Sequence, residues 1–407
     1  MGGWFRKLCL MAAVSALALW GCHGQEDAAG PGRQPLTLWY YWDVPGNQRR
    51  LKALAQEYNQ MQDEAEINLR YVPDEDFKKQ LALSTAEGKR PDMALVDSSD
   101  FQFFHQMEPF ADLTEELPQL SSYLEQSVAP CTVDGHIYGM PFGMNCTALF
   151  YNQALLDQAG VKPPETWEEF EQAAGAVSAL GVDGFALTAL QTEECMYEFL
   201  PMLWSMGGSV DDISGPQSRG AFDLLGRLSA DGALSRQSIS LTMGDLTNQF
   251  LKGNIGMMFN SSMAVDTIRE KAPELAFGVA PVPGGQEQVT VVGGEILAVS
   301  GSGHTKEAVG FLKFLADKER MADYMDDFGF LAPRRDVMEQ QYGNDPVKGQ
   351  FAELFRSARL REISPQWPRI SLALSETVSQ VIIEDGDRTA ILDGAAAVIG
   401  QIRREYP

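Results

Sequence analysis

The sequence predicts an α/β protein built from two lobes, and three features of the 407-residue chain support this prediction. The chain is long enough for two domains, because a domain has roughly 150 residues. Segments typical of strands and helices alternate between residues 36 and 96, as they do in an α/β lobe. A second series of such segments begins near Ala148.

The first series alternates strands with helices. "LTLWYYW" is a β-type run, "INLRYV" alternates with period two, and "MALV" is a short apolar run typical of a buried parallel strand. The first helix has apolar residues at the i, i+3, i+4, i+7 spacing of an amphipathic helix, namely Leu51, Leu54, Ala55 and Tyr58. The expected elements are strands over 36–42, 67–72 and 93–96, and helices over 48–61 and 74–87.

The second series contains further strands and helices, and the last sixty residues are mainly helical. Thr166 and Glu169 have the spacing of a capping box, so a helix is expected to begin there. The helix "YEFLPMLWSMGG" is expected to end at its glycines. The expected strands are "ALFYN", "GFALTA", "NIGMMF", "AFGVAPVP" and "EILAVS", and "KEAVGFLKFLAD" is expected to be a helix.

The N-terminus has the features of an export signal. Arg6 and Lys7 precede an apolar run over 8–20, which is too short to cross a bilayer, since a spanning helix needs about 20 residues. The run ends in Leu19-Trp20-Gly21-Cys22, which resembles the lipobox of bacterial lipoproteins and implies that Cys22 carries a lipid. The alternative is an ordinary signal peptide that contains a cysteine by chance. The polar, Gly- and Pro-rich segment after Cys22 is typical of a flexible tether.

The charge of the chain argues against several partners. It has 56 acidic and 32 basic residues, for a formal net charge of −24. Binding of nucleic acid depends on basic residues that neutralise phosphates, so no nucleic-acid partner is expected. The same surplus of acid argues against a basic surface for anionic membranes.

Three cysteines remain beyond the lipobox, and an odd number cannot all pair within one chain. If Asp134-Gly135 forms a hairpin turn, Cys131 lies opposite Tyr138 and not opposite Cys146. We expect three free, buried thiols, at Cys131, Cys146 and Cys195.

No constellation typical of catalysis or metal binding occurs. The four histidines are far apart, and the sequence contains no H-E-x-x-H, C-x-x-C, G-x-S-x-G or phosphate-binding Gly-rich motif. Carboxylates are abundant, but the sequence marks no pair of them as an acid and base of a glycosidase. We expect no enzyme activity, no metal and no cofactor.

Aromatic and acidic residues at the ends of expected strands are the candidates for ligand binding. Ligands of open α/β sheets bind outside the carboxyl ends of the strands, where Trp42 and Asp43 stand. An indole can pack on the C–H face of a sugar while a carboxylate accepts its hydroxyl hydrogen bonds. The alternative for Trp42 is a place in the core, which is the expectation for Trp39 and Trp167. Asp97 follows "MALV" and either faces a ligand or caps the next helix.

Several longer motifs, in this order along the chain, resemble one family. They are "PDMALVDSSD", "DGHIYGMPFGMNCTALFYNQALLDQAGVKPPETWEEF", "LWSMGG", "FLKGNIGMMFNSS", "FGVAPVPGG", "VVGGEILAVS" and "FGFLAPRRDV". Together they resemble the extracellular solute-binding proteins of bacterial ABC importers, in the carbohydrate-binding group that includes maltose-binding protein.

The resemblance implies a two-lobed, periplasmic-binding-protein-like type II fold, with a hinge between the lobes and a ligand cleft. The chain is expected to cross between the lobes near Asn145–Ala148, near Met257–Ser261 and after Phe311. The expected organisation is a lipoprotein signal at 1–21, a tether at 22–35, a first lobe of 36–146 with 260–312, and a second lobe of 147–259 with 313–407.

The resemblance also implies which positions face the sugar. Met263 stands where family members often have a tryptophan, so one stacking platform is missing. The implied ligand-binding residues are Trp42, Asp43, Asp97, Asn145, Trp204, Asn260, Gly294, Glu295 and Arg334.

The resemblance further implies the role of the protein. A lipid-anchored monomer on the extracytoplasmic face of the cell membrane would capture a mono- or oligosaccharide and deliver it to a membrane permease. Two alternatives stay open: a lipoprotein that presents its ligand to a membrane sensor, and a binder of a cationic solute such as a polyamine.

Overall fold

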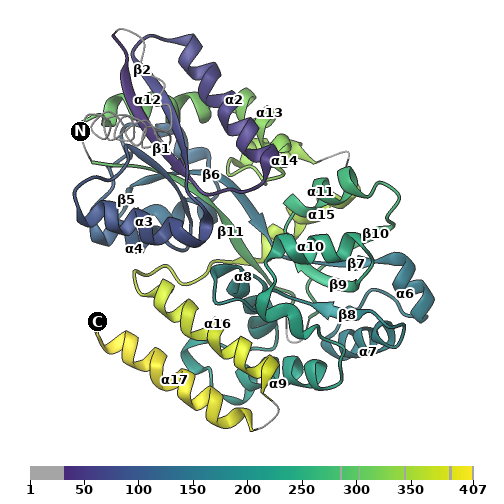
Figure 1. The fold of residues 1–407 in the computed structure, drawn as a ribbon. Helices are drawn as coiled ribbons and strands as arrows, with labels where there is room; N and C mark the ends of the chain where they lie inside the picture. The colour runs from purple at the N-terminus through teal and green to yellow at the C-terminus, as the bar shows by residue number, and fades with distance from the viewer. Residues whose placement is uncertain (1–31, 285–286, 302, 343–344, 385–386, 406–407) are drawn as a thin grey trace, which may run out of the picture.

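The computed structural model describes residues 32–405, apart from 285–286, 302, 343–344 and 385–386, and folds them into two lobes (Figure 1). Each lobe is built on its own sheet. The expected signal segment, Cys22 and most of the expected tether lie outside the described residues.

The sheet of the first lobe has the order β12-β11-β3-β1-β2, and β6 also pairs with β11. β1 is parallel to β2 and β3, whereas β11 is antiparallel to β3 and β6. The strands are β1 (Gln34–Tyr40), β2 (Ala65–Tyr71), β3 (Met93–Asp97), β6 (Gly139–Cys146), β11 (Thr290–Val299) and β12 (Ala358–Arg359).

Helices cover both faces of this sheet because side chains alternate between the faces along each strand. Leu36 and Leu38 of β1 belong to a core with α2, α12 and α13, whereas Trp39 belongs to a core with α3 and α4. The helices are α2 (Pro45–Met61), α3 (Asp74–Ala86), α4 (Phe101–Met107), α12 (Thr305–Leu315), α13 (Lys318–Phe328) and α14 (Arg335–Gln341).

The sheet of the second lobe has the order β10-β7-β9-β8. Its strands are β7 (Ala148–Asn152), β8 (Asp183–Ala186), β9 (Ile255–Asn260) and β10 (Phe277–Ala280). One face packs mainly on α7, α8, α9, α16 and α17, and the other on α10, α11 and α15. The helices are α6 (Gln153–Ala159), α7 (Trp167–Ser178), α8 (Glu193–Ser205), α9 (Pro216–Ala230), α10 (Met243–Leu251), α11 (Met263–Lys271), α15 (Pro346–Leu354), α16 (Trp367–Ile383) and α17 (Arg388–Glu405).

The expected elements occur, but several of their ends differ. The strand β11 begins five residues before the expected "EILAVS", and α8 begins four residues before the expected "YEFLPMLWSMGG". The capping box of α7 is present, with Thr166 accepting from the backbone of Glu169 and Glu169 accepting from the backbone of Thr166. β1 begins at Gln34, so the last two residues expected in the tether belong to a strand. This strand start is favoured because Gln34 pairs with Ala65 of β2.

Two segments lie in the lobe opposite to the expected one. Residues 260–280 stay in the second lobe, since β10 pairs with β7 and the apolar face of α11 packs on Phe150 and Phe250. Residues 313–341 stay in the first lobe, because the apolar faces of α13 and α14 pack into the core beneath β1. The chain therefore crosses after β6, between β10 and β11, and after α14, and the crossings expected near Met257–Ser261 and after Phe311 are wrong.

A short hairpin confirms the expected position of Cys131. β4 (Thr132–Val133) pairs with β5 (His136–Ile137), and Tyr138 donates its backbone N–H to the Cys131 carbonyl. Cys131, Cys146 and Cys195 are free and buried, as expected.

Candidate functional site

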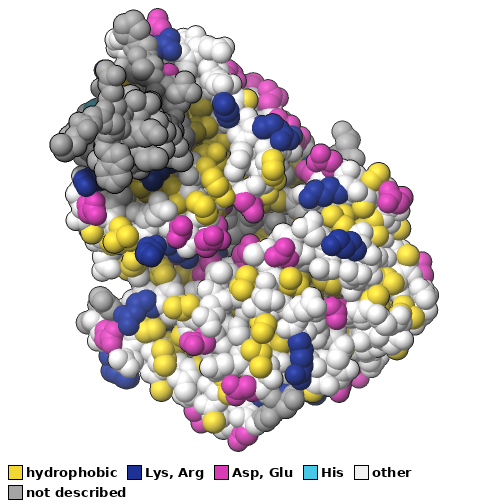
Figure 2. All heavy atoms as spheres, viewed as in Figure 1, with side chains coloured by type: hydrophobic (Ala, Val, Ile, Leu, Met, Phe, Trp, Pro, Cys, Tyr) yellow, Lys and Arg dark blue, Asp and Glu magenta, His cyan; other side chains and the backbone are white. Residues whose placement is uncertain are grey.

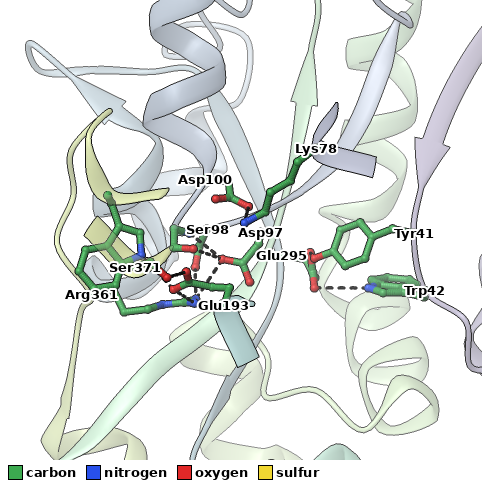
Figure 3. Close-up of polar contacts among 12 residues, drawn as sticks. Tyr41, Trp42, Lys78, Asp97, Ser98, Asp100, Glu193, Glu295, Arg361 and Ser371 are labelled. Atoms are coloured by element: carbon green, nitrogen blue, oxygen red, sulfur yellow. Dashed lines mark hydrogen bonds and ion pairs between the residues drawn. The ribbon is translucent and has the colours of Figure 1, made fainter. Parts of the chain in front are cut away.

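Two carboxylates stand side by side where the first sheet approaches the second lobe. Asp97 ends β3, and Glu295 lies opposite it in register on β11. We call the region around them, between the two lobes, the lobe boundary. Figure 3 shows Glu295 beside Tyr41 and Trp42, and Asp97 between Lys78 and Arg361.

Glu295 is fixed by donors from its own lobe. The Tyr41 hydroxyl donates to Oε2 at 2.6 Å, and the Trp42 indole Nε1 donates to Oε1 at 3.3 Å. The residue is only 7% exposed. Burial and the nearby Asp97 charge raise the pKa of Glu295 to about 8, although both hydrogen bonds lower it.

Trp42 lies in the core, which is the alternative to its predicted role in ligand binding. The residue is 6% exposed, and its ring centroid lies 5.3–5.7 Å from those of Phe142, Phe328 and Phe330. These phenylalanines pack around the indole, and its N–H is held by Glu295. Little of the ring surface is therefore open to a sugar in this structure.

Arg361 connects Asp97 of the first lobe to Glu193 of the second lobe. Its Nη2 donates to Asp97 Oδ1 at 3.0 Å, and its Nη1 donates to Glu193 Oε1 at 2.8 Å (Figure 3). The arginine is 5% exposed. Desolvation lowers the pKa of Arg361, but Asp97 and Glu193 outweigh it and raise the pKa further above its ordinary value.

A second cation at the lobe boundary, Lys78, belongs to the first lobe. Lys78 of α3 pairs with Asp100 at 2.8 Å. Burial raises the pKa of Asp100 to about 6 although Lys78 lowers it. Desolvation lowers the pKa of Lys78, but the Asp100 and Glu193 carboxylates outweigh it, so the ammonium stays charged.

The second lobe contributes Glu194, next to Glu193 at the start of α8. Glu194 is half-buried and accepts the backbone N–H of Met243 at 3.0 Å. Burial, together with the charges of Asp74 and Asp43 in the first lobe, raises the pKa of Glu194 to about 7, although the hydrogen bond from Met243 lowers it. Figure 2 shows acidic side chains gathered along the line where the lobes meet.

Asp43 and Asp74 complete this acidic region from the first lobe. Both are exposed, at the ends of the segments that follow β1 and β2. Burial by the surrounding protein raises the pKa of Asp74, Lys78 lowers it, and Asp97 and Asp43 raise it.

Two further predicted residues lie near β11. Asn145 pairs with Gly293 in register, and a Cβ on Gly293 would collide with the Asn145 side chain. The buried Asn145 Oδ1 has no hydrogen-bond partner among the described residues. Gly294 has φ +148°, and its carbonyl accepts the Ser98 N–H at 3.0 Å. Only glycine fits there, because a side chain would collide with the Gly143 carbonyl.

The remaining three predicted residues make contacts elsewhere. Asn260 donates to the Thr247 hydroxyl at 3.0 Å and accepts the Ser261 N–H. Trp204 packs against the core of the second lobe. The Arg334 guanidinium pairs with Asp336 at 3.0 Å and also donates to the Ala316 carbonyl. None of these contacts involves Asp97 or Glu295.

Sequence reasoning missed several residues of the lobe boundary. Asp74 follows β2 as Asp43 follows β1, so the rule on strand ends could have found it. Tyr41 stands in the same aromatic run as Trp42. No local signal distinguishes Arg361, since its partner Asp97 is 264 positions away. The other missed residues are Lys78, Glu193 and Glu194.

Within the described part of the chain, no cluster of three or more metal-ligating side chains occurs. Among the same residues, no helix is both long and apolar enough to span a membrane.

Comparison with known proteins gives one family and one fold. The family model described as bacterial extracellular solute-binding protein matches residues 53–348. A Brucella abortus (strain 2308) protein, named only as a binding protein, is 26% identical over 408 residues, covering 96% of this chain and 97% of its own. The multiple sugar-binding protein of Streptococcus mutans is 23% identical over 367 residues, covering 85% of this chain and 86% of its own.

Solved structures share the fold. An ABC transporter solute-binding protein from Thermotoga lettingae, bound with α-D-tagatose, superposes with a TM-score of 0.83 at 21% identity. The match covers 91% of this chain and 99% of that protein. The predicted two-lobed α/β fold is therefore confirmed.

Proposed function

Because the chain belongs to the bacterial extracellular solute-binding protein family, we propose that it captures a mono- or oligosaccharide between its lobes and delivers this sugar to an ABC permease.

The observation that carries this proposal is the meeting of carboxylates from both lobes. Asp97 of the first lobe and Glu193 of the second bind the same Arg361 guanidinium, at 3.0 and 2.8 Å, and Asp43 and Asp74 raise the pKa of Glu194. Carboxylates accept hydrogen bonds from hydroxyl groups, so a sugar could bond to both lobes at once. Such a ligand favours the closed arrangement, in which both sets of bonds form. The sugar-binding relative and the tagatose-bound neighbour support a sugar as the ligand class.

A thermal-shift screen against mono- and oligosaccharides tests this proposal. A sugar present at 100 times its Kd stabilises the folded protein by about 2.7 kcal/mol. Asp74→Asn should weaken the response to that sugar, whereas Glu87→Gln, beyond the other end of α3, should not, because Glu87 pairs with Lys89. A panel in which no sugar raises the melting temperature would contradict the proposal.

The same carboxylates support a second candidate, a cationic solute such as a polyamine. The charges of Asp74 and Asp43 raise the pKa of Glu194, and those of Asp97 and Asp74 raise the pKa of Glu295. Several acidic groups are therefore near one another. A ligand cation would reduce their repulsion. Spermidine should be included in the same thermal-shift screen, at low and at high salt. Salt weakens the attraction between charges, so high salt should weaken the binding of a cation more than the binding of a sugar. If spermidine raises the melting temperature and no sugar does, the cationic solute replaces the sugar as the proposed ligand.

No catalytic step is part of the proposal. The homologous proteins named above are binding proteins. The bound sugar should be recovered unchanged after long incubation with purified protein. Turnover that disappears with a single carboxylate substitution would contradict this.

The extracytoplasmic location follows from the family, and attachment to the membrane by a lipid anchor is part of the proposal. We expect Cys22→Ala to abolish lipid labelling and to release the protein from membranes. A mutant that still sediments with membranes through its N-terminus would contradict the anchor.

Delivery to a permease is tested by sugar uptake in cells that lack this gene. Lost uptake, restored by the intact gene, supports an importer. If the purified protein binds the sugar but cells that lack the gene take up this sugar normally, presentation to a membrane sensor would be favoured.

The protein is also proposed to be a monomer, and size-exclusion chromatography should give the elution volume of a monomer.

A further inference from the structure

We propose that Arg361 is a positioning residue that ties the two lobes together and orients Asp97 toward the ligand. The proposal rests on the proposed function only for the role of Asp97, since the tie between the lobes needs no ligand.

Arg361 lies in a segment that connects the lobes. β12 pairs with β11 of the first lobe through Ala358 and Arg359, and the chain then runs into α16 of the second lobe. A buried arginine in this connection can reach both lobes. Its planar guanidinium presents several donors at once, so it can hold two carboxylates.

On the second lobe, Glu193 is fixed before it meets Arg361. The Trp367 indole donates to Glu193 Oε1 at 2.9 Å, and the Ser371 hydroxyl donates to Oε2. Both donors belong to α16, which packs on the same core as α8. The Arg361–Glu193 pair is therefore a rigid part of the second lobe.

On the first lobe, Asp97 is held from two sides through one oxygen. Oδ1 accepts from Arg361 Nη2, from the Ser99 backbone N–H at 2.8 Å and from the Ser99 hydroxyl at 2.6 Å. All three of these hydrogen bonds from described residues end on Oδ1, so Oδ2 can accept a hydrogen bond from a ligand hydroxyl. Arg361 also lies 3.4 Å from the Ser98 hydroxyl.

The geometry links lobe position to ligand binding. When the lobes separate, Arg361 stays with Glu193, and Asp97 loses the donor that fixes its orientation. A ligand that bonds to Asp97 Oδ2 then favours the arrangement in which Arg361 holds Oδ1. Burial strengthens the hydrogen bond between Arg361 and Asp97 and makes an unpaired charge at either residue costly. The two lobes are therefore either joined through this pair or separated, with no stable arrangement between.

Small-angle scattering of sugar-free protein tests the tie. Asp97→Ala leaves Arg361 paired with Glu193, so this variant should fold while losing the ion pair between the lobes. We expect its radius of gyration to increase by about 1 Å over the roughly 21 Å expected for a compact chain of this length. Arg361→Lys, which cannot reach both carboxylates with a planar fork, should give a similar increase.

Arg359→Gln is the matched control. Arg359 stands two residues earlier and makes an ion pair with Glu287, with both side chains 47% exposed. This variant should scatter like the original protein, and all three variants should keep its circular dichroism. Equal radii for Asp97→Ala, Arg361→Lys and Arg359→Gln would overturn the proposal. Because no sugar is present, this result is independent of whether a sugar is the ligand.

Discussion

Glu295 and Asp97 occupy opposed positions on adjacent strands, yet their surroundings differ. Glu295 is held by the uncharged donors Tyr41 and Trp42, which belong to the same lobe and to its aromatic core. Asp97 is held by the Arg361 guanidinium, which is fixed to the other lobe through Glu193. Contacts within one lobe stabilise the folding of that lobe, whereas contacts between lobes set how the lobes lie. Two neighbouring carboxylates therefore have different structural effects.

The largest effect is expected for Trp42→Ala. Removing a buried aromatic side chain costs about 3–5 kcal/mol of unfolding free energy, because a cavity remains among Phe142, Phe328 and Phe330. Urea unfolding without ligand measures this loss. If the variant unfolds like the original protein and binds its sugar more weakly, Trp42 belongs to the ligand site instead and the contrast with Asp97 disappears.

A smaller effect is expected for Glu295→Ala, because it leaves the buried Trp42 N–H without an acceptor, whereas the part-buried Tyr41 hydroxyl can turn to water. Each unsatisfied buried donor costs about 1–3 kcal/mol. Tyr41→Phe removes one donor and keeps the Glu295–Trp42 bond, so it should cost less in the same urea experiment. The scattering radius should stay unchanged in both variants. An expanded Glu295→Ala protein with normal stability would show that Glu295, like Asp97, sets lobe position.

The smallest effect is a pH dependence from Glu194, which faces the acids Asp43 and Asp74 across the lobe boundary. Its pKa is raised to about 7 from the ordinary value of 4.5. A raised carboxyl pKa contributes stability that is complete below pH 4.5 and is lost as the pH rises through 7. Unfolding free energy should therefore fall between pH 5 and pH 8, and Glu194→Gln should make this fall shallower. Parallel pH profiles for the two proteins would place Glu194 away from the acidic region.

The sequence by itself determined the type and approximate place of the expected elements. The i, i+3, i+4, i+7 spacing gave α2, alternation gave β2, and the Thr166–Glu169 spacing gave the start of α7. These features depend on residues within a few positions of one another, so the local sequence carries them. The position of Asp97 at a strand end was readable for the same reason.

The tertiary structure alone decided which carboxylate meets which partner. Trp42 and Glu295 are 253 positions apart, and Asp97 and Arg361 are 264 apart. Packing also decided to which lobe α11, β10 and α13 belong. The sequence of an amphipathic helix shows which of its faces is buried, but it does not show which other elements cover that face. Arg361 carries no local signal at all, since its role depends on two carboxylates that only the folding of both lobes brings within 3 Å of it.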